Sequence, residues 1–98
     1  MLTHVVMWRL HAQDAAQRAE RVSAVVAAFE ALRGCTPGLI DLRVGGNSLA
    51  TADAWDVALI TVFESETALA GYNEDPRHLA IKAMVGPWRA ARAVVDWG

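Results

Sequence analysis

The stretch Phe63–Ala80 reads FESETALAGYNEDPRHLA and contains two helix starts in close succession. Ser65 can accept a hydrogen bond from the first turn of a helix that ends near Asn73. Asp75 can cap a second helix, and Pro76 can open it because proline is tolerated at the first helical position. The stretch therefore predicts a helix that follows a strand and is broken in two.

This break brings two chemically useful side chains close together, the phenol of Tyr72 and the imidazole of His78. His78 falls in the first turn of the second helix, where free backbone N–H groups and the positive end of the helix dipole disfavour imidazolium. We therefore expect a neutral His78 that is available as a base, with Tyr72 only a loop away.

Outward from this stretch, the spacing of apolar residues predicts one strand, a helix and two strands before it, and one strand after it. The predicted strands span Thr3–Leu10, Leu39–Val44, Trp55–Phe63 and Ala93–Trp97, the first helix runs from about Asp14 to Arg33, and the broken helix runs from Ser65 to about Val85. The order βαββαβ belongs to the α+β class. It predicts a ferredoxin-like plait, in which two helices cover one face of a four-stranded antiparallel sheet.

Both faces of the predicted sheet are apolar. Alternation along the first strand places His4, Val6, Trp8 and Leu10 on one side and Val5 and Met7 on the other. Two helices can cover only one face, and a large exposed apolar face is unusual for a soluble monomer. We therefore predict a homodimer that packs its sheet faces together into a dimeric α/β barrel.

Composition bounds the class of protein. The chain has 98 residues, of which 54% are hydrophobic and 20% are charged, as expected for one compact soluble domain over residues 1–98. Its apolar runs are too short for a membrane span, and MLTHVVMWRL at the amino terminus has no basic leader, so we expect a cytoplasmic protein without a membrane partner. Nine basic residues are scattered among eleven acidic ones, which predicts no binding of nucleic acid.

The sequence offers no metal or redox motif. Cys35 has no second cysteine to pair with and follows a helix stop, so we expect a buried or half-buried structural thiol without a catalytic role. The three histidines lack the close spacing of zinc ligands, and His11 is expected to face solvent beyond the first strand. We expect neither a metal nor a cofactor.

Five segments together resemble one family, the stress-responsive α/β-barrel (Dabb) domain of the dimeric α+β barrel group. These segments are His4-Val5-Val6, Pro37-Gly38, Val57–Ser65, Tyr72 with Asp75-Pro76-Arg77-His78, and Val94-Val95-Asp96-Trp97. The likeness covers nearly the whole chain and implies a single Dabb-like domain. The family includes small plant stress proteins, many bacterial members, and a polyketide cyclase that makes a resorcylic acid without a cofactor.

The cyclase branch implies a site for this chain. Its acid–base pair, a tyrosine and a histidine in a pocket between sheet and helices, matches Tyr72 and His78, and its first-strand histidine matches His4. The implied binding residues are His4, Val6, Trp8, Val26, Phe29, Leu59, Ile81 and Trp88. The chain departs from the cyclase in having Val57 in place of a further pocket histidine, and Lys82 in place of a small residue.

Several of these residues also have a purely structural interpretation. His4 is expected to be a core histidine bonded to a neighbour, or else to orient His78 or a ligand. Trp8 and Trp88 fill the core or stack on a planar ligand.

Three functions remain open at this point. The first is a cofactor-free cyclase, isomerase or lyase for a small hydrophobic polyketide or phenol. The second is a non-catalytic stress-responsive or small-molecule-binding dimer, and the third is a cofactor-free monooxygenase, against which the Val94–Trp97 ending argues. An open apolar cavity of roughly 300 Å³ or more around Tyr72 and His78 would favour the enzyme over a packed interior.

Overall fold

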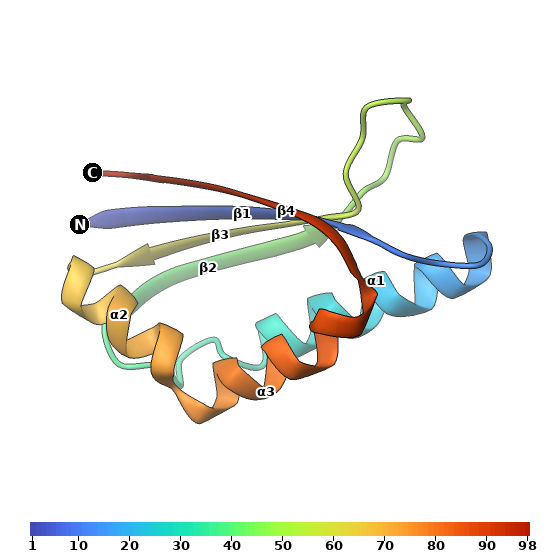
Figure 1. Ribbon diagram of the computed structural model, residues 1–98. Helices are drawn as coiled ribbons and strands as arrows, with labels where there is room; N and C mark the ends of the chain where they lie inside the picture. Colours follow the sequence, from blue (N-terminus) through green and yellow to red (C-terminus); the bar gives the residue numbers. More distant parts are fainter.

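The computed structural model describes residues 1–98 and shows one four-stranded antiparallel sheet with helices on one face (Figure 1). The strand order is β2-β3-β1-β4. The elements in chain order are β1 (Leu2–Leu10), α1 (Ala15–Glu30), β2 (Leu39–Gly46), β3 (Val57–Phe63), α2 (Glu66–Glu74), α3 (Pro76–Val85), the 3-10 turn η1 (Gly86–Trp88) and β4 (Arg89–Trp97). The predicted ferredoxin-like fold is confirmed. No helix has the length and apolar character that crossing a bilayer requires.

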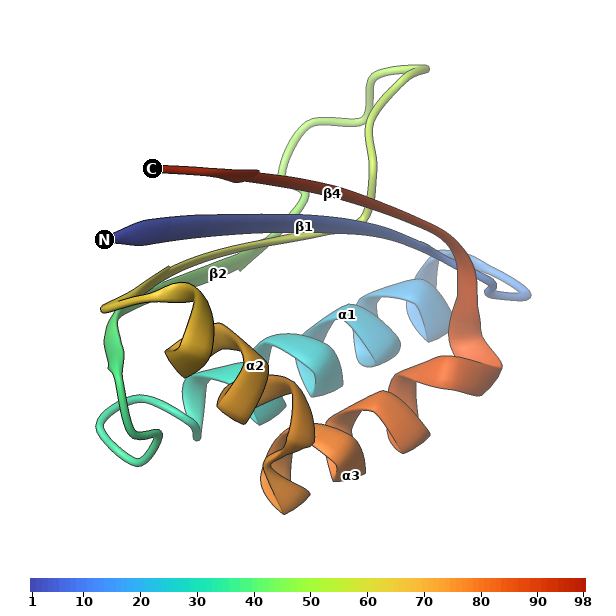
Figure 2. The same cartoon turned by 60° about the vertical axis from the view of Figure 1, so that its left-hand side comes forward.

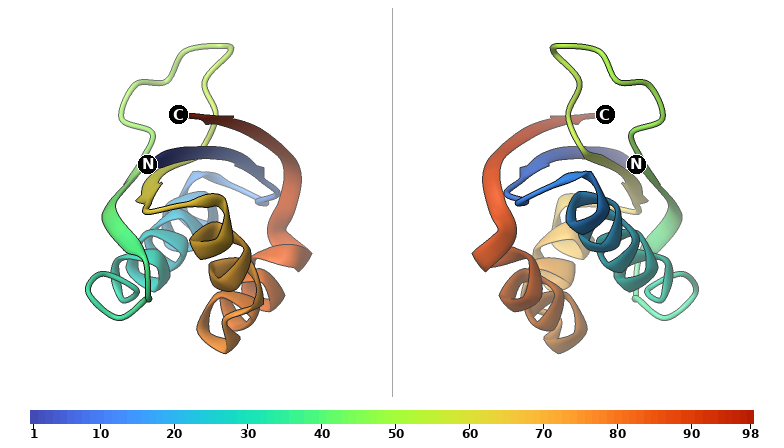
Figure 3. Two further views of the ribbon diagram at one scale, coloured as in Figure 1. Left: turned by 90° about the vertical axis from the view of Figure 1, so that its left-hand side faces the viewer. Right: turned by 90° about the vertical axis from the view of Figure 1, so that its right-hand side faces the viewer.

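The helices form a single layer beneath the curved sheet, with α1 on one side and α2 and α3 on the other (Figure 2). Viewed end-on, β4 at the sheet edge bends down toward the end of α3 (Figure 3). Each helix starts at a side-chain cap. Asp14 accepts from the N–H of Gln17 at 2.8 Å, and Ser65 accepts from the N–H of Ala68 at 3.1 Å. The predicted cap at Ser65 is therefore confirmed.

Side-chain alternation along the central strands is as predicted. On β1, His4, Val6, Trp8 and Leu10 are buried on the face that packs against the helices, whereas Met7 is 37% exposed on the opposite face. The core closes where α1 meets the sheet, because Trp8 stacks on Phe29 with ring centroids 5.3 Å apart. The outer face of the sheet stays open in the single chain.

Several element boundaries differ from the prediction, and β2 runs to Gly46 rather than Val44. β4 begins at Arg89 rather than Ala93, because its backbone continues to pair with β1, including Arg92 opposite Trp8. α1 ends at Glu30, before the predicted Arg33, and the chain then turns toward a positive-φ Gly34. β3 begins at Val57 rather than Trp55, since the carboxylate of Asp56 accepts the N–H of Leu10 at 2.7 Å at the sheet margin.

The prediction of a buried or half-buried thiol at Cys35 is wrong. Cys35 is exposed in the loop after α1, where its carbonyl oxygen accepts from the guanidinium of Arg77 at 2.7 Å. The apolar position in this turn is filled by Leu32, which is buried. Cys35 therefore contributes its backbone rather than its thiol to the packing of the loop.

Candidate functional site

A cavity of about 400 Å³ lies between the inner face of the sheet and the helix layer. Its apolar wall comes from three elements besides α3: Val6 and Trp8 of β1, Leu59 of β3 and Phe29 of α1. Ile81 and Val85 of α3 complete this wall. The interior is therefore open rather than filled by side chains, and its volume falls within the usual range for small-molecule sites.

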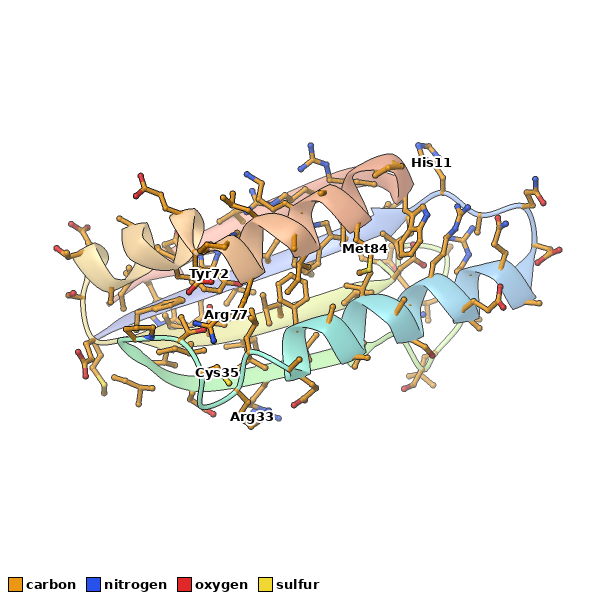
Figure 4. The ribbon with its side chains drawn as sticks, turned by 90° about the horizontal axis from the view of Figure 1, so that it is seen from below. His11, Arg33, Cys35, Tyr72, Arg77 and Met84 are labelled. Atoms are coloured by element: carbon orange, nitrogen blue, oxygen red, sulfur yellow. The ribbon has the colours of Figure 1, made fainter.

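Tyr72 and His78 meet at the wall of this cavity. Tyr72 lies in the last turn of α2 and His78 in the first turn of α3, and their ring centroids are 4.2 Å apart with an interplanar angle of 38°. Tyr72 also packs on Phe63, with centroids 5.1 Å apart. Figure 4 shows Tyr72 inside the molecule, whereas the labelled His11 and Arg33 project at its margin.

Two polar atoms of this pair are buried without a hydrogen-bond partner in the protein, the phenol oxygen of Tyr72 and Nδ1 of His78. Buried polar groups in folded proteins are nearly always bonded, because an unbonded one loses its hydration without compensation. Tyr72 and His78 both line the cavity. Unbonded polar atoms in such a position are typical of groups that form hydrogen bonds to a ligand or a solvent molecule.

The surroundings favour the neutral form of both members of the pair. Burial lowers the pKa of His78, and the positive charges of Lys82 and Arg92 lower it further. The backbone of Asn73 lies close enough to raise the pKa in opposition, although it makes no hydrogen bond of normal geometry to Nδ1. Burial raises the pKa of Tyr72 far above its ordinary value, and Arg92 opposes that shift. The site therefore offers a neutral imidazole as proton acceptor and a neutral phenol as hydrogen-bond donor.

His4 is held by a carboxylate from the adjacent edge strand. His4 and Asp96 are directly opposite in the β1–β4 register, and Nδ1 of His4 is bonded to Oδ1 of Asp96. His4 is thus a buried histidine bonded to a neighbour, as its structural interpretation predicts. It also lines the cavity, and the Asp96 contact fixes the tautomer so that Nε2 is the ring nitrogen left for a ligand.

Most of the predicted binding residues line this cavity, and two do not. His4, Val6, Trp8, Phe29, Leu59 and Ile81 line it together with Tyr72 and His78. Val26 and Trp88 pack against the core elsewhere. Val26 follows the fully buried Val25 on α1. Trp88 lies in η1, where the guanidinium carbon of Arg21 is 5.3 Å from the centroid of the Trp88 ring.

The predicted binding residues did not include the exposed polar residues that line the cavity and that we call its mouth, Asn73, Lys82, Arg89 and Arg92. Lys82 was noted only as a departure from the cyclase branch. Lys82 follows His78 by one helical turn, so the spacing i, i+4 places both on one face of α3 and could have identified it. Arg89 and Arg92 were missed because the last strand was predicted to begin only after them.

The family profile of the stress responsive A/B barrel domain, Dabb, matches residues 2–98. The chain belongs to the Dabb family. No curated protein matches its sequence.

Solved structures share the fold of this Dabb domain at low sequence identity. A dimeric protein of unknown function with a ferredoxin-like fold from Bacteroides fragilis is 23% identical with a TM-score of 0.88, over 98% of this chain and 93% of that one. The hydroxynitrile lyase from Passiflora edulis is 17% identical with a TM-score of 0.78, over 98% and 90% of the chains. A putative antibiotic biosynthesis monooxygenase from Nitrosomonas europaea is 18% identical with a TM-score of 0.70, over 100% and 97%.

Proposed function

We propose that this Dabb domain is a cofactor-independent acid–base enzyme, a cyclase, isomerase or lyase, for a small hydrophobic substrate of polyketide or phenolic type. One observation carries the proposal: the phenol oxygen of Tyr72 and Nδ1 of His78 are buried without partners in adjacent rings at the wall of an open cavity. A non-catalytic dimer whose interior is filled by side chains would have no cavity for a ligand.

In this mechanism, neutral His78 removes a proton from a carbon activated by a neighbouring carbonyl and becomes imidazolium. The electron pair of the broken C–H bond moves onto the carbonyl oxygen, where the phenol of Tyr72 donates a hydrogen bond to the developing enolate. In a cyclase, the enolate carbon then attacks a second carbonyl of the same molecule, and the proton returns from imidazolium to the new alkoxide. His4, oriented by Asp96, positions the substrate against this pair.

Turnover of a poly-β-ketone substrate by the His78→Ala and Tyr72→Phe variants tests the proposal. We expect each variant to lose about 100-fold or more of kcat, the usual contribution of a positioned acid or base. His11→Ala is the matched control, because His11 is exposed and lies outside the cavity. Unchanged turnover in both site variants would contradict the assignment. Binding without turnover by the native protein would favour the small-molecule-binding dimer instead.

We further propose that the domain is a homodimer through the outer face of its sheet. Met7, Ile60, Val95 and Trp97 are large apolar residues exposed on the strands of the single chain. A fold neighbour from Bacteroides fragilis is itself described as dimeric. Pairing two such faces would remove this apolar surface from water.

A further inference from the structure

The mouth of the cavity carries an unbalanced positive charge. Lys82, Arg89 and Arg92 line it, and no aspartate or glutamate does. None of the three forms an ion pair, whereas Arg18, Arg33 and Arg77 each pair with a carboxylate. Because the chain as a whole has a net charge of −2, this is a local concentration of cations on a weakly acidic protein.

Two elements bring these cations together around one opening. Lys82 lies one turn beyond His78 on α3, so both side chains leave the same face of the helix. Arg92 is directly opposite Trp8 in the β1–β4 register, and paired residues of antiparallel strands point to the same face of a sheet. Trp8 faces the helices, so the Arg92 side chain points toward the cavity. Arg89, at the start of β4, is opposite Leu10 beside the β-bulge.

The charge reaches the reactive pair. Lys82 and Arg92 both lower the pKa of His78, and Arg92 also lowers the pKa of Tyr72 against the larger effect of burial. Charges beside a partly desolvated cavity interact more strongly than they do in bulk water. An anion at the mouth would therefore be held close to the proton acceptor and the proton donor of the site.

We propose that the ligand of this cavity is an amphipathic carboxylate, with an apolar ring or chain packed between Trp8 and Ile81 and a carboxylate bound by Lys82, Arg89 and Arg92. This inference rests on the proposed function, since it names the substrate class of the same site. The planar guanidinium forks of the two arginines suit a carboxylate, which accepts two parallel hydrogen bonds. The apolar wall supplies the rest of the affinity by burial.

A pair of probes that differ only in charge tests the inference, 4-pentylbenzoate and the neutral 4-pentylbenzamide. Isothermal titration calorimetry on the native dimer should show that the benzoate binds about tenfold or more tightly, because hydrogen bonds to charged groups are the stronger class. In the double variant Lys82→Gln/Arg92→Gln this preference should fall to near unity, while the affinity for the benzamide stays the same. The control Arg18→Gln/Arg33→Gln also removes two positive charges, both outside the cavity lining, and should leave the preference intact.

Several outcomes would overturn the inference. Equal binding of the two probes by the native protein, no detectable binding of the benzoate, or a preference that survives in the double variant each removes the carboxylate assignment. Tighter binding of 4-pentylphenyl phosphate than of the benzoate would assign the mouth to a phosphate ester instead.

The calorimetry measures binding without turnover. Its result can therefore contradict the carboxylate ligand without contradicting the proposed enzyme, and the reverse also holds. A protein that selects the benzoate but converts no substrate contradicts only the acid–base enzyme. A protein whose turnover depends on His78 and Tyr72 but that ignores the charge of the probe contradicts only the carboxylate ligand.

Discussion

The ring centroids of Tyr72 and His78 lie 4.2 Å apart, although the two residues belong to different helices. The single residue between those helices, Asp75, produces this contact. Its extended backbone ends α2, its N–H donates to the carbonyl oxygen of Tyr72 at 3.1 Å, and its carboxylate accepts the N–H of Arg77 at 2.8 Å. The geometry of the candidate catalytic pair therefore depends on one helix junction.

Replacing Asp75 should weaken the fold and the site together. We expect Asp75→Ala to lower the free energy of unfolding by about 1 kcal/mol, the usual cost of losing an N-cap, and to reduce turnover because α3 no longer fixes His78 against Tyr72. Asp75→Asn is the matched control, since asparagine caps equally well and loses only the charge of a partly exposed ion pair with Arg77. Urea denaturation should rank native and Asp75→Asn together above Asp75→Ala, and equal losses in both variants would contradict the capping role.

Tyr72→Phe should reduce activity without reducing stability. The hydroxyl that it removes is buried without a partner, so its loss relieves a desolvation cost while the ring packing on Phe63 and His78 is kept. We expect an unchanged free energy of unfolding or a gain of about 1 kcal/mol, together with a large loss of kcat. A loss of stability above about 1 kcal/mol would show that the hydroxyl has a bonding partner in the folded state.

His78 should titrate below the ordinary histidine range. Burial and the nearby cations Lys82 and Arg92 lower its pKa, and His4 adds to this effect, so Lys82→Gln should move the pKa upward. Titration of the His78 imidazole by NMR, with its resonance assigned from His78→Gln, measures the shift directly. Arg33→Gln is expected to leave the pKa in place, and a native pKa at or above about 6.5 would contradict the prediction.

The same shift sets the sign of a pH dependence of stability. Because the pKa of His78 is lower in the folded state, the unfolded chain binds the proton first as the pH falls through about 6.5. The contribution of His78 to stability is thus fully present above that pH and is lost as the pH falls toward the folded-state pKa. Urea denaturation at a series of pH values should show a shallower acid loss in His78→Gln than in the native protein.

The sequence predicted the parts of this structure that have strong local signals. Strand alternation separates His4, Val6 and Trp8 from Met7 because side chains in a strand have a period of two. The Asp75-Pro76 junction was predicted because a cap and a proline act within one turn. The Asp96 contact to His4 was not, since it depends on the register between the first and last strands of the chain.

The arginines at the mouth of the cavity were not predicted, for a related reason. The stretch from Arg89 to Arg92 contains two arginines and two alanines, and this composition does not indicate a strand. Pairing with β1 decides its extended conformation. Only that pairing shows which way Arg92 faces. Val26 was placed in the cavity because the first helix forms the pocket wall in the cyclase branch, and Trp88 because it follows Gly86-Pro87. Neither signal distinguishes a cavity wall from ordinary core packing.

Alanine substitutions at Gly38 and Gly34 separate the cost of a strained backbone from the cost of a steric clash. Both have positive φ, 76° and 74°, but a Cβ on Gly38 would lie 2.5 Å from Cβ of Ala68 on α2, whereas nothing lies near one on Gly34. Gly34→Ala should cost about 1–2 kcal/mol for the left-handed backbone alone. Gly38→Ala should cost at least about 1 kcal/mol more, because α2 must shift. Equal losses on urea denaturation would mean that α2 accommodates the methyl group without cost.

Ile60 provides the test of the dimer. It lies on the outer face of the sheet beside Val5, which in turn pairs with Val95, so a lysine at this position would place a charge in the middle of the proposed interface. Leu79→Lys is the matched control, because Leu79 is also exposed but lies on α3 in the helix layer. Light scattering at micromolar concentration should give twice the chain mass of 10.6 kDa for the native protein and for Leu79→Lys, and a lower mass for Ile60→Lys. The melting temperature of the native protein should also rise with its concentration, since association stabilises the folded state by mass action. A native monomer, or an Ile60→Lys protein that remains dimeric, would mean that the apolar outer face is not what holds two copies together.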